Sequence, residues 1–179
     1  MGECHSPLQL LSLLEYGRVV VFNDRQSTRL HGFDYSKAGA YFVTLCTWRK
    51  EEVFGRVEGN GVHLSPEGKI VLEEWLASFA IRQELRRDTF AVMPNHFHAI
   101  VWLGHGHRSS LGRAVGGFKS AATKRINALN DTPGRPLWQR NYHDRLIRHD
   151  QELQRVRRYI QDNPRKWDHD PNHPGHPQR

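Results

Sequence analysis

The pattern of apolar and polar positions predicts several strands. Alternation with a period of two, and an excess of β-branched and aromatic residues, is typical of strands. Two short apolar runs also flank the turn sequence Gly59-Asn60-Gly61, which predicts a small hairpin over 53–64. The segments with strand patterns are 40–48, 89–93, 96–103 and, as an extended stretch, 137–147.

Apolar residues at helical spacing predict three helices between these strands. The first begins at Ser65, an N-cap residue followed by proline, and its apolar stripe reaches residue 79. The second covers 111–129, and the third follows a predicted cap at Asp150 and covers 151–162. Pro164 ends the third helix, because proline cannot continue the backbone hydrogen bonding.

This order of elements predicts an α+β fold. We expect a ferredoxin-like antiparallel sheet with helices packed on one face, plus the small extra hairpin. Residues 25–167 are predicted to form a single domain, preceded by an N-terminal extension over 1–24. The His- and Pro-rich stretch 168–179 is predicted to be a disordered tail.

Composition and charge indicate which kind of binding partner and which cellular compartment to expect. The 179 residues carry a formal net charge of +7, and the pI is near 9.8. This charge favours an acidic binding partner, above all nucleic acid. The alternative is an ordinary basic soluble protein, which is common. The only cysteines, Cys4 and Cys46, indicate neither a disulfide framework nor a cysteine-based zinc site, and we expect a cytoplasmic protein. No apolar run approaches about 20 residues, so we expect no membrane span, and the stretch 8–22 does not have the pattern of a signal peptide.

The strand over 96–103 carries the first candidate site. His96 and His98 are two residues apart, so they point to the same side of the sheet. Two imidazoles on one strand make half of a metal site and need further ligands from elsewhere in the fold. The ordinary alternative is that each histidine is a polar residue on a half-exposed strand.

Tyr159 and Asn163 carry the second candidate site, on the last helix. They are four residues apart, one helical turn, and Tyr159 lies at the edge of the apolar stripe. If this helix packs against the histidine strand, the Asn163 amide oxygen would join His96 and His98 around a divalent cation. Spacing alone favours simpler roles: Tyr159 as an aromatic at the edge of the core, and Asn163 as a helix C-cap.

Seven short motifs, in order along the chain, indicate a family. The chain resembles the REP-associated tyrosine transposases, within the wider group of single-tyrosine insertion-sequence transposases and HUH endonucleases. The motifs are RLHGFDYS at 29–36, GAYFVT at 39–44, MPNHFH at 93–98, GFKS at 117–120, WQRNY at 138–142, LIR at 146–148 and RYIQDNP at 158–164.

The resemblance implies an activity and a set of site residues. It implies a transposase that cleaves and rejoins single-stranded DNA at hairpin (REP-like) sites through a 5′-phosphotyrosine, with Tyr159 as nucleophile. His96, His98 and Asn163 would hold Mg²⁺ or Mn²⁺, and two imidazole ligands make Mn²⁺ at least as plausible as Mg²⁺. Tyr142 is a competing nucleophile, and Tyr159 is preferred because Asn-Pro follows it and because it lies at the edge of its helix's apolar stripe.

Cationic side chains are the candidates for contacts with DNA phosphates. An unpaired strand would also need aromatic stacking, and no small-molecule substrate is expected. The candidates are Arg25, Arg29, Arg113, Lys119, Lys124, Arg125, Arg140 and Arg145.

Two other functions remain open from the sequence. One is a non-catalytic DNA-hairpin-binding protein derived from such a transposase, and the other is a metal-dependent phosphodiesterase that uses water. The family includes monomers and homodimers, and no stretch of this chain marks a dimer surface, so both states remain open.

Overall fold

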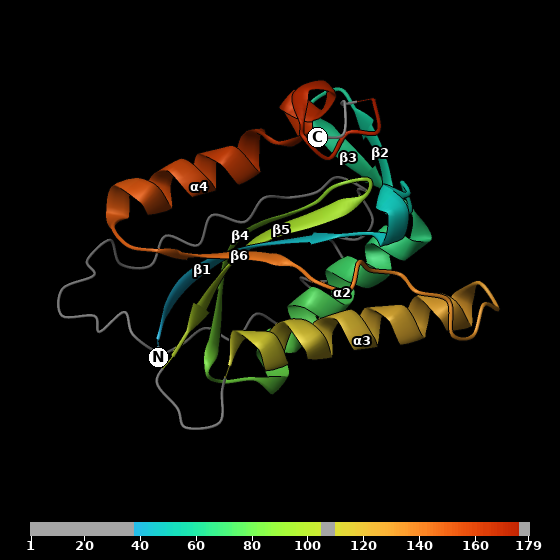
Figure 1. Cartoon of the computed structure of the whole chain (residues 1–179), viewed down its shortest axis with the longest axis horizontal. Helices are drawn as coiled ribbons and strands as arrows, with labels where there is room; N and C mark the ends of the chain where they lie inside the picture. Colours follow the sequence, from blue (N-terminus) through green and yellow to red (C-terminus); the bar gives the residue numbers. More distant parts are fainter. Residues whose placement is uncertain (1–37, 105–109, 176–179) are drawn as a thin grey trace, which may run out of the picture.

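The computed structural model describes residues 38–104 and 110–175, and its centre is a four-stranded antiparallel sheet (Figure 1). The strand order is β4-β5-β1-β6, so β4 and β6 form the edges. The bounds are β1 Gly39–Cys46, β4 Leu85–Val92, β5 His96–Leu103 and β6 His143–Ile147. A separate hairpin pairs β2 (Gly55–Glu58) with β3 (Gly61–Leu64) around the predicted turn. The α+β class and the extra hairpin are therefore confirmed.

The helices cover both faces of the sheet rather than one. Helices α2 (Pro66–Ile81) and α3 (Leu111–Leu129) lie on one face, in the ferredoxin-like order β1-α2-β4-β5-α3-β6. Helix α4 (Asp150–Asp162) lies across the opposite face (Figure 1). The expectation of helices on a single face is correct for α2 and α3 and wrong for α4.

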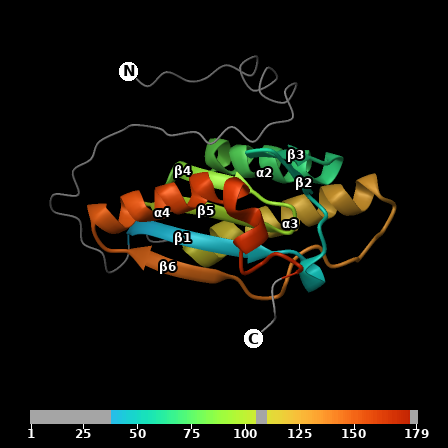
Figure 2. The same cartoon turned by 90° about the horizontal axis from the view of Figure 1, so that it is seen from above.

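Strand β5 carries side chains on both faces that pack against helices. Phe97 contacts the rings of Trp75 on α2 and Phe118 on α3. His98, on the other face, contacts the ring of Tyr159 on α4. Along β5 every residue except Trp102 is buried, and strands buried on both faces read as continuous apolar runs. Figure 2 shows the same layering from above, with α4 in front of the sheet and α2 and α3 behind it.

Side chains cap the starts of helices α2 and α4. The Ser65 hydroxyl accepts a hydrogen bond from the Gly68 N–H at 3.0 Å, which confirms the predicted cap of α2. Helix α4 is capped one residue earlier than predicted, by His149, whose Nδ1 accepts from the Glu152 N–H at 3.2 Å. Only the end of the extended stretch 137–147 pairs as a strand, while Trp138 forms an isolated bridge with Thr47.

The chain after α4 returns to the core. A 3-10 helix, η2 (Pro164–His169), buries Trp167, and Asp170 beyond it is only 3 % exposed. The prediction that disorder begins at residue 168 is therefore wrong for 168–175. The predicted N-terminal extension, the start of the predicted domain and the last four residues lie outside the described residues. Within the part of the chain that the structure describes, no helix is long and apolar enough to cross a membrane.

Candidate metal and tyrosine site

His96 and His98 lie side by side on the face of the sheet that α4 covers. Their ring centroids are 4.5 Å apart, and the two side chains are 0 % and 2 % exposed. The register with β1 places Cys46 opposite His96 and Thr44 opposite His98. The predicted common orientation of the two histidines is confirmed, but the half-exposed alternative is wrong because α4 and η2 bury this face.

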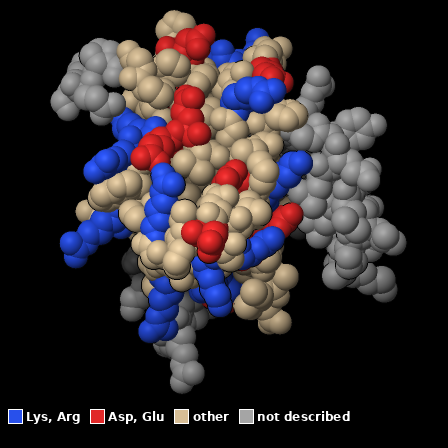
Figure 3. All heavy atoms as spheres, turned by 90° about the vertical axis from the view of Figure 1, so that its right-hand side faces the viewer, with Lys and Arg blue, Asp and Glu red and all other residues tan. Residues whose placement is uncertain are grey.

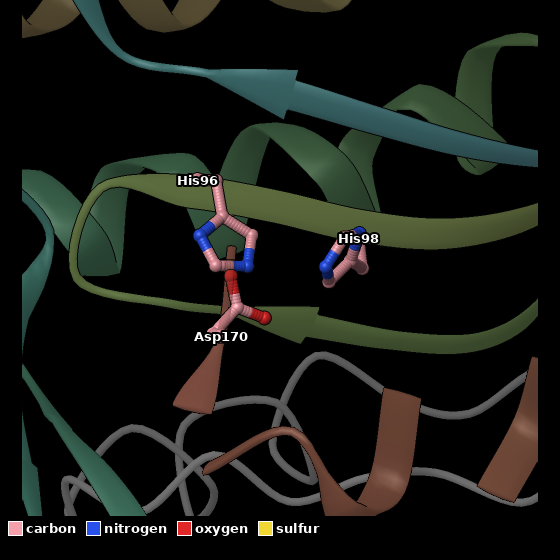
Figure 4. Close-up of side chains that lie close together, drawn as sticks. All are labelled: His96, His98 and Asp170. Carbon is pink, nitrogen blue, oxygen red and sulfur yellow. The ribbon is translucent and has the colours of Figure 1, made fainter. Parts of the chain in front are cut away.

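Asp170 completes a compact group with the two histidines (Figure 4). The possible ligand atoms of His96, His98 and Asp170 all lie within 4.8 Å of one another, and all three residues are buried. Sequence reasoning missed Asp170, because it falls in a Pro- and His-rich stretch without periodicity. Trp167, three residues earlier, was the available signal, since burying a tryptophan removes a large apolar area from water.

Hydrogen bonds orient the group, and two of its acceptors find no partner in the part of the chain that the structure describes. His96 Nδ1 lies 2.9 Å from Asn95 Oδ1, and the Asn163 Nδ2 donates to Asp170 Oδ2 at 2.7 Å. Among the described residues, the buried atoms His96 Nε2 and Asn163 Oδ1 then have no hydrogen-bond partner. Buried polar atoms are rarely unpaired, and ligating histidines typically bond their other ring nitrogen to the protein. The pattern fits a bound divalent cation.

Burial keeps both imidazoles neutral. It lowers the pKa of His96 to about 3, against a smaller opposing effect of the Asn163 side chain. Burial and the neighbouring His96 hold the pKa of His98 well below its usual value. Neutral imidazoles offer lone pairs, which is the form that metal ligands require.

Tyr159 stands at the solvent edge of this group. Its hydroxyl lies 3.4 Å from His98 Nε2, while the residue as a whole is 42 % exposed. Burial, followed by the carboxylate of Asp170, raises the pKa of Tyr159 to about 12. The phenol is therefore protonated at neutral pH and must be deprotonated to act as a nucleophile.

Tyr142 lies on the other side of the sheet. It is half-buried, and a Cβ at Gly112 of α3 would be 3.9 Å from its hydroxyl. Helix α3 packs on the face opposite to the histidines. The structure thus brings Tyr159, and not Tyr142, to His98.

The predicted DNA contacts are dispersed. Arg25 and Arg29 lie outside the described residues. Four candidates, Arg113, Lys119, Lys124 and Arg125, belong to α3, on the far face from the histidines. The remaining two, Arg140 and Arg145, lie before and within β6.

Several of these cations already have protein partners. Lys119 Nζ donates to the backbone oxygen of Gln139 at 2.7 Å, and Arg125 forms ion pairs with Glu73 and Glu74. Figure 3 shows the same mixture on one face of the molecule, where acidic side chains lie among the basic ones. Lys119 and Arg125 therefore already make polar contacts within the protein.

Comparison with known proteins gives a consistent result. A family model described as IS200-like transposase matches residues 41–163. An uncharacterized protein of Haemophilus influenzae is 29 % identical over 166 residues, covering 82 % of this chain and 91 % of that protein. A REP-associated tyrosine transposase, solved bound to a REP hairpin, has a similar fold with a TM-score of 0.59 and 18 % identity, over 78 % of this chain and 74 % of the other.

Proposed function

Because this chain belongs to the IS200-like transposase family, we propose that it cleaves and rejoins single-stranded DNA through a covalent bond to Tyr159. One observation carries the proposal. The Tyr159 hydroxyl lies 3.4 Å from His98 Nε2, at the edge of a buried group in which His96 Nε2 and Asn163 Oδ1 have no partner in the described residues. A tyrosine at the solvent edge of a candidate cation site is the arrangement that this chemistry requires.

The reaction conserves the phosphodiester bond energy. The Tyr159 oxygen attacks the scissile phosphorus while its proton passes to solvent, the bond from phosphorus to the 3′ oxygen breaks, and that oxygen takes up a proton from solvent. The products are a 5′-phosphotyrosine and a free 3′-hydroxyl. A second 3′-hydroxyl then attacks the phosphotyrosine and releases Tyr159, so strands are rejoined without ATP.

His96, His98, Asn163 and Asp170 would hold the divalent cation. A bound Mg²⁺ or Mn²⁺ would supply a Lewis acid that polarises the phosphate. Two nitrogen and two oxygen donors suit Mn²⁺ at least as well as Mg²⁺. Asp170 also orients the Asn163 amide, because it accepts from Nδ2 and so leaves Oδ1 facing the group.

The proposed substrate is unpaired DNA next to a hairpin. Support comes from the net charge of +7 and from the fold shared with a transposase that was solved bound to a REP hairpin. One copy of the chain supplies both Tyr159 and the histidines, so we propose that a monomer can carry out cleavage.

A covalent trapping assay tests this function. The full-length protein is incubated with labelled single-stranded hairpin oligonucleotides and Mn²⁺ or Mg²⁺, and then separated on a denaturing gel. We expect a protein–DNA band that is lost with a chelator and in Tyr159→Phe, and kept in Tyr142→Phe.

The other outcomes identify the alternatives. Cleavage without a shifted band, retained in Tyr159→Phe, would establish a phosphodiesterase that uses water. Hairpin binding with neither cleavage nor adduct would establish a non-catalytic binding protein.

A further inference from the structure

A cavity of about 550 Å³ opens beside Tyr159, between α4 and the edge strand β6. Pockets for small ligands typically measure about 300–1,000 Å³. Its lining includes Phe42 of β1, His143 and Arg145 of β6, and Arg155, Val156 and Tyr159 of α4. The cavity therefore adjoins the proposed nucleophile but lies outside the histidine group.

The inner wall of the cavity is aromatic and apolar. The Phe42 ring meets the Tyr159 ring edge-on, with centroids 5.9 Å apart, and lies 5.3 Å from the His98 ring. Val156, which is buried, comes from the facing helix. Nucleic-acid bases stack on such aromatic surfaces whatever their sequence.

The outer rim of the cavity carries two arginines, Arg145 and Arg155, beside one acidic residue, Asp144. Arg145 lies opposite Phe42 in the register of β6 with β1, which places both side chains on the cavity face. Its Nε is 3.4 Å from Glu152 Oε1, which is a long ion pair, and the Arg145 side chain remains 59 % exposed and open to a ligand. Arg155 lies on the helix side of the cavity and is exposed. Both arginines are therefore placed to bind a phosphate.

We propose that this cavity binds one unpaired nucleotide adjacent to the phosphate that Tyr159 attacks. The base packs against Phe42 and Val156, and Arg145 and Arg155 bind its phosphate. The inference rests on the proposed function for the identity of the ligand, single-stranded DNA. It adds a site that recognises the unpaired state of the substrate, because a paired and stacked base could not enter.

Methyl NMR on the full-length protein, with chelator present, tests the proposal without any cleavage. The probes are a hexamer of thymidine nucleotides and an abasic hexamer with the same number of phosphates. We expect the thymidine hexamer to shift the Val156 methyl resonances and to bind at least fivefold more tightly than the abasic hexamer. Equal affinities, or unmoved Val156 resonances, would overturn the proposal.

Three variants localise the effect. Arg155→Glu should lower the affinity for the thymidine hexamer at least fivefold. The control is Arg158→Glu, the same change at an exposed position on α4 outside the cavity lining, and it should change this affinity less than twofold. Phe42→Leu should lower the affinity for the thymidine hexamer but not the affinity for the abasic hexamer. Equal losses in the two arginine variants would indicate general charge attraction and reject the site.

The two proposals fail in different experiments. An absent covalent adduct would reject Tyr159 as nucleophile and leave base-dependent binding at Val156 intact. Base-independent binding would reject the cavity and leave the covalent adduct intact.

Discussion

Arg157 of α4 binds Asp88 of β4 through two hydrogen bonds, from Nε to Oδ1 at 2.9 Å and from Nη2 to Oδ2 at 2.5 Å. The Trp102 Nε1 donates to the same carboxylate at 2.8 Å, and Asp88 is 6 % exposed. This pair fixes α4 to its own sheet two residues before Tyr159. It therefore positions the tyrosine against the histidines of the same chain.

Removing the charge of Asp88 should loosen α4. Asp88→Asn leaves the Arg157 guanidinium without its carboxylate in a mostly buried position, where breaking an ion pair costs about 3 kcal/mol. We expect the free energy of unfolding to fall by about that amount in urea titrations, and adduct formation to slow. Asp162→Asn removes an exposed partner of Lys166 and should cost less than about 1 kcal/mol. Equal losses in the two variants would show that α4 does not depend on Asp88.

The contribution of Asp88 should also depend on pH. Burial raises the pKa of this carboxyl, but the hydrogen bonds from Arg157, Trp102 and the Thr89 backbone outweigh burial, so its pKa is lowered. A lowered pKa means that the unfolded state takes up the proton first, at about pH 4. The stability difference between wild type and Asp88→Asn should be constant from about pH 7 to pH 5 and shrink below about pH 4. A difference that grows in acid would contradict this assignment.

Because Asp88 holds α4 in place, Tyr159 should act only on DNA bound by its own chain. We expect no adduct when Tyr159→Phe and His96→Gln proteins are mixed, since neither chain carries a complete site. Wild type diluted with either inactive variant is the control, and its activity should follow the amount of wild type. An adduct in the mixture of the two inactive proteins would show that α4 exchanges between copies.

The part of the site on β5 could be predicted from the sequence, because alternation with a period of two determines which side chains share a face of a strand. His96 and His98 follow from it directly. The position of α4 could not be predicted from the sequence. Its apolar stripe, Leu153, Val156 and Ile160, must pack against some surface but does not specify which one. The burial of both faces of β5 supplies that surface.

The contacts of Asp170 and of the Asp88–Arg157 pair could not be predicted from the sequence, for a related reason. Asp170 reaches the histidines through η2, an irregular turn after the helix that no periodicity describes. Asp88 and Arg157 are 69 residues apart, and nothing in either local pattern specifies the other. Contacts made by polar residues across the fold depend on the three-dimensional arrangement of elements that local patterns only partly specify.

Asp170 should influence Tyr159 even without a metal. Burial, and after it the nearby Asp170 carboxylate, which disfavours a phenolate, together raise the pKa of Tyr159 to about 12. We expect Asp170→Asn to lower this pKa, which would remain above about 10 because the burial persists. NMR of ring-labelled tyrosines measures it, with Tyr159→Phe to assign the resonance. Asp168→Asn, at an exposed position, should leave the Tyr159 pKa unchanged, and an equal change in both variants would reject a direct effect.

Binding of Mn²⁺ should stabilise the folded protein through His96. A ligand that binds only the folded state adds about 2.7 kcal/mol at 100 times its Kd, which raises the Tm of a domain of this size by about 5–10 °C. We expect this shift in the wild type and in Tyr159→Phe, because Tyr159 is not among the proposed ligands. His96→Gln should abolish it, whereas His63→Gln, at an exposed position on β3, should retain it. A shift that survives in His96→Gln would place the cation at other residues and separate the buried histidine group from metal binding.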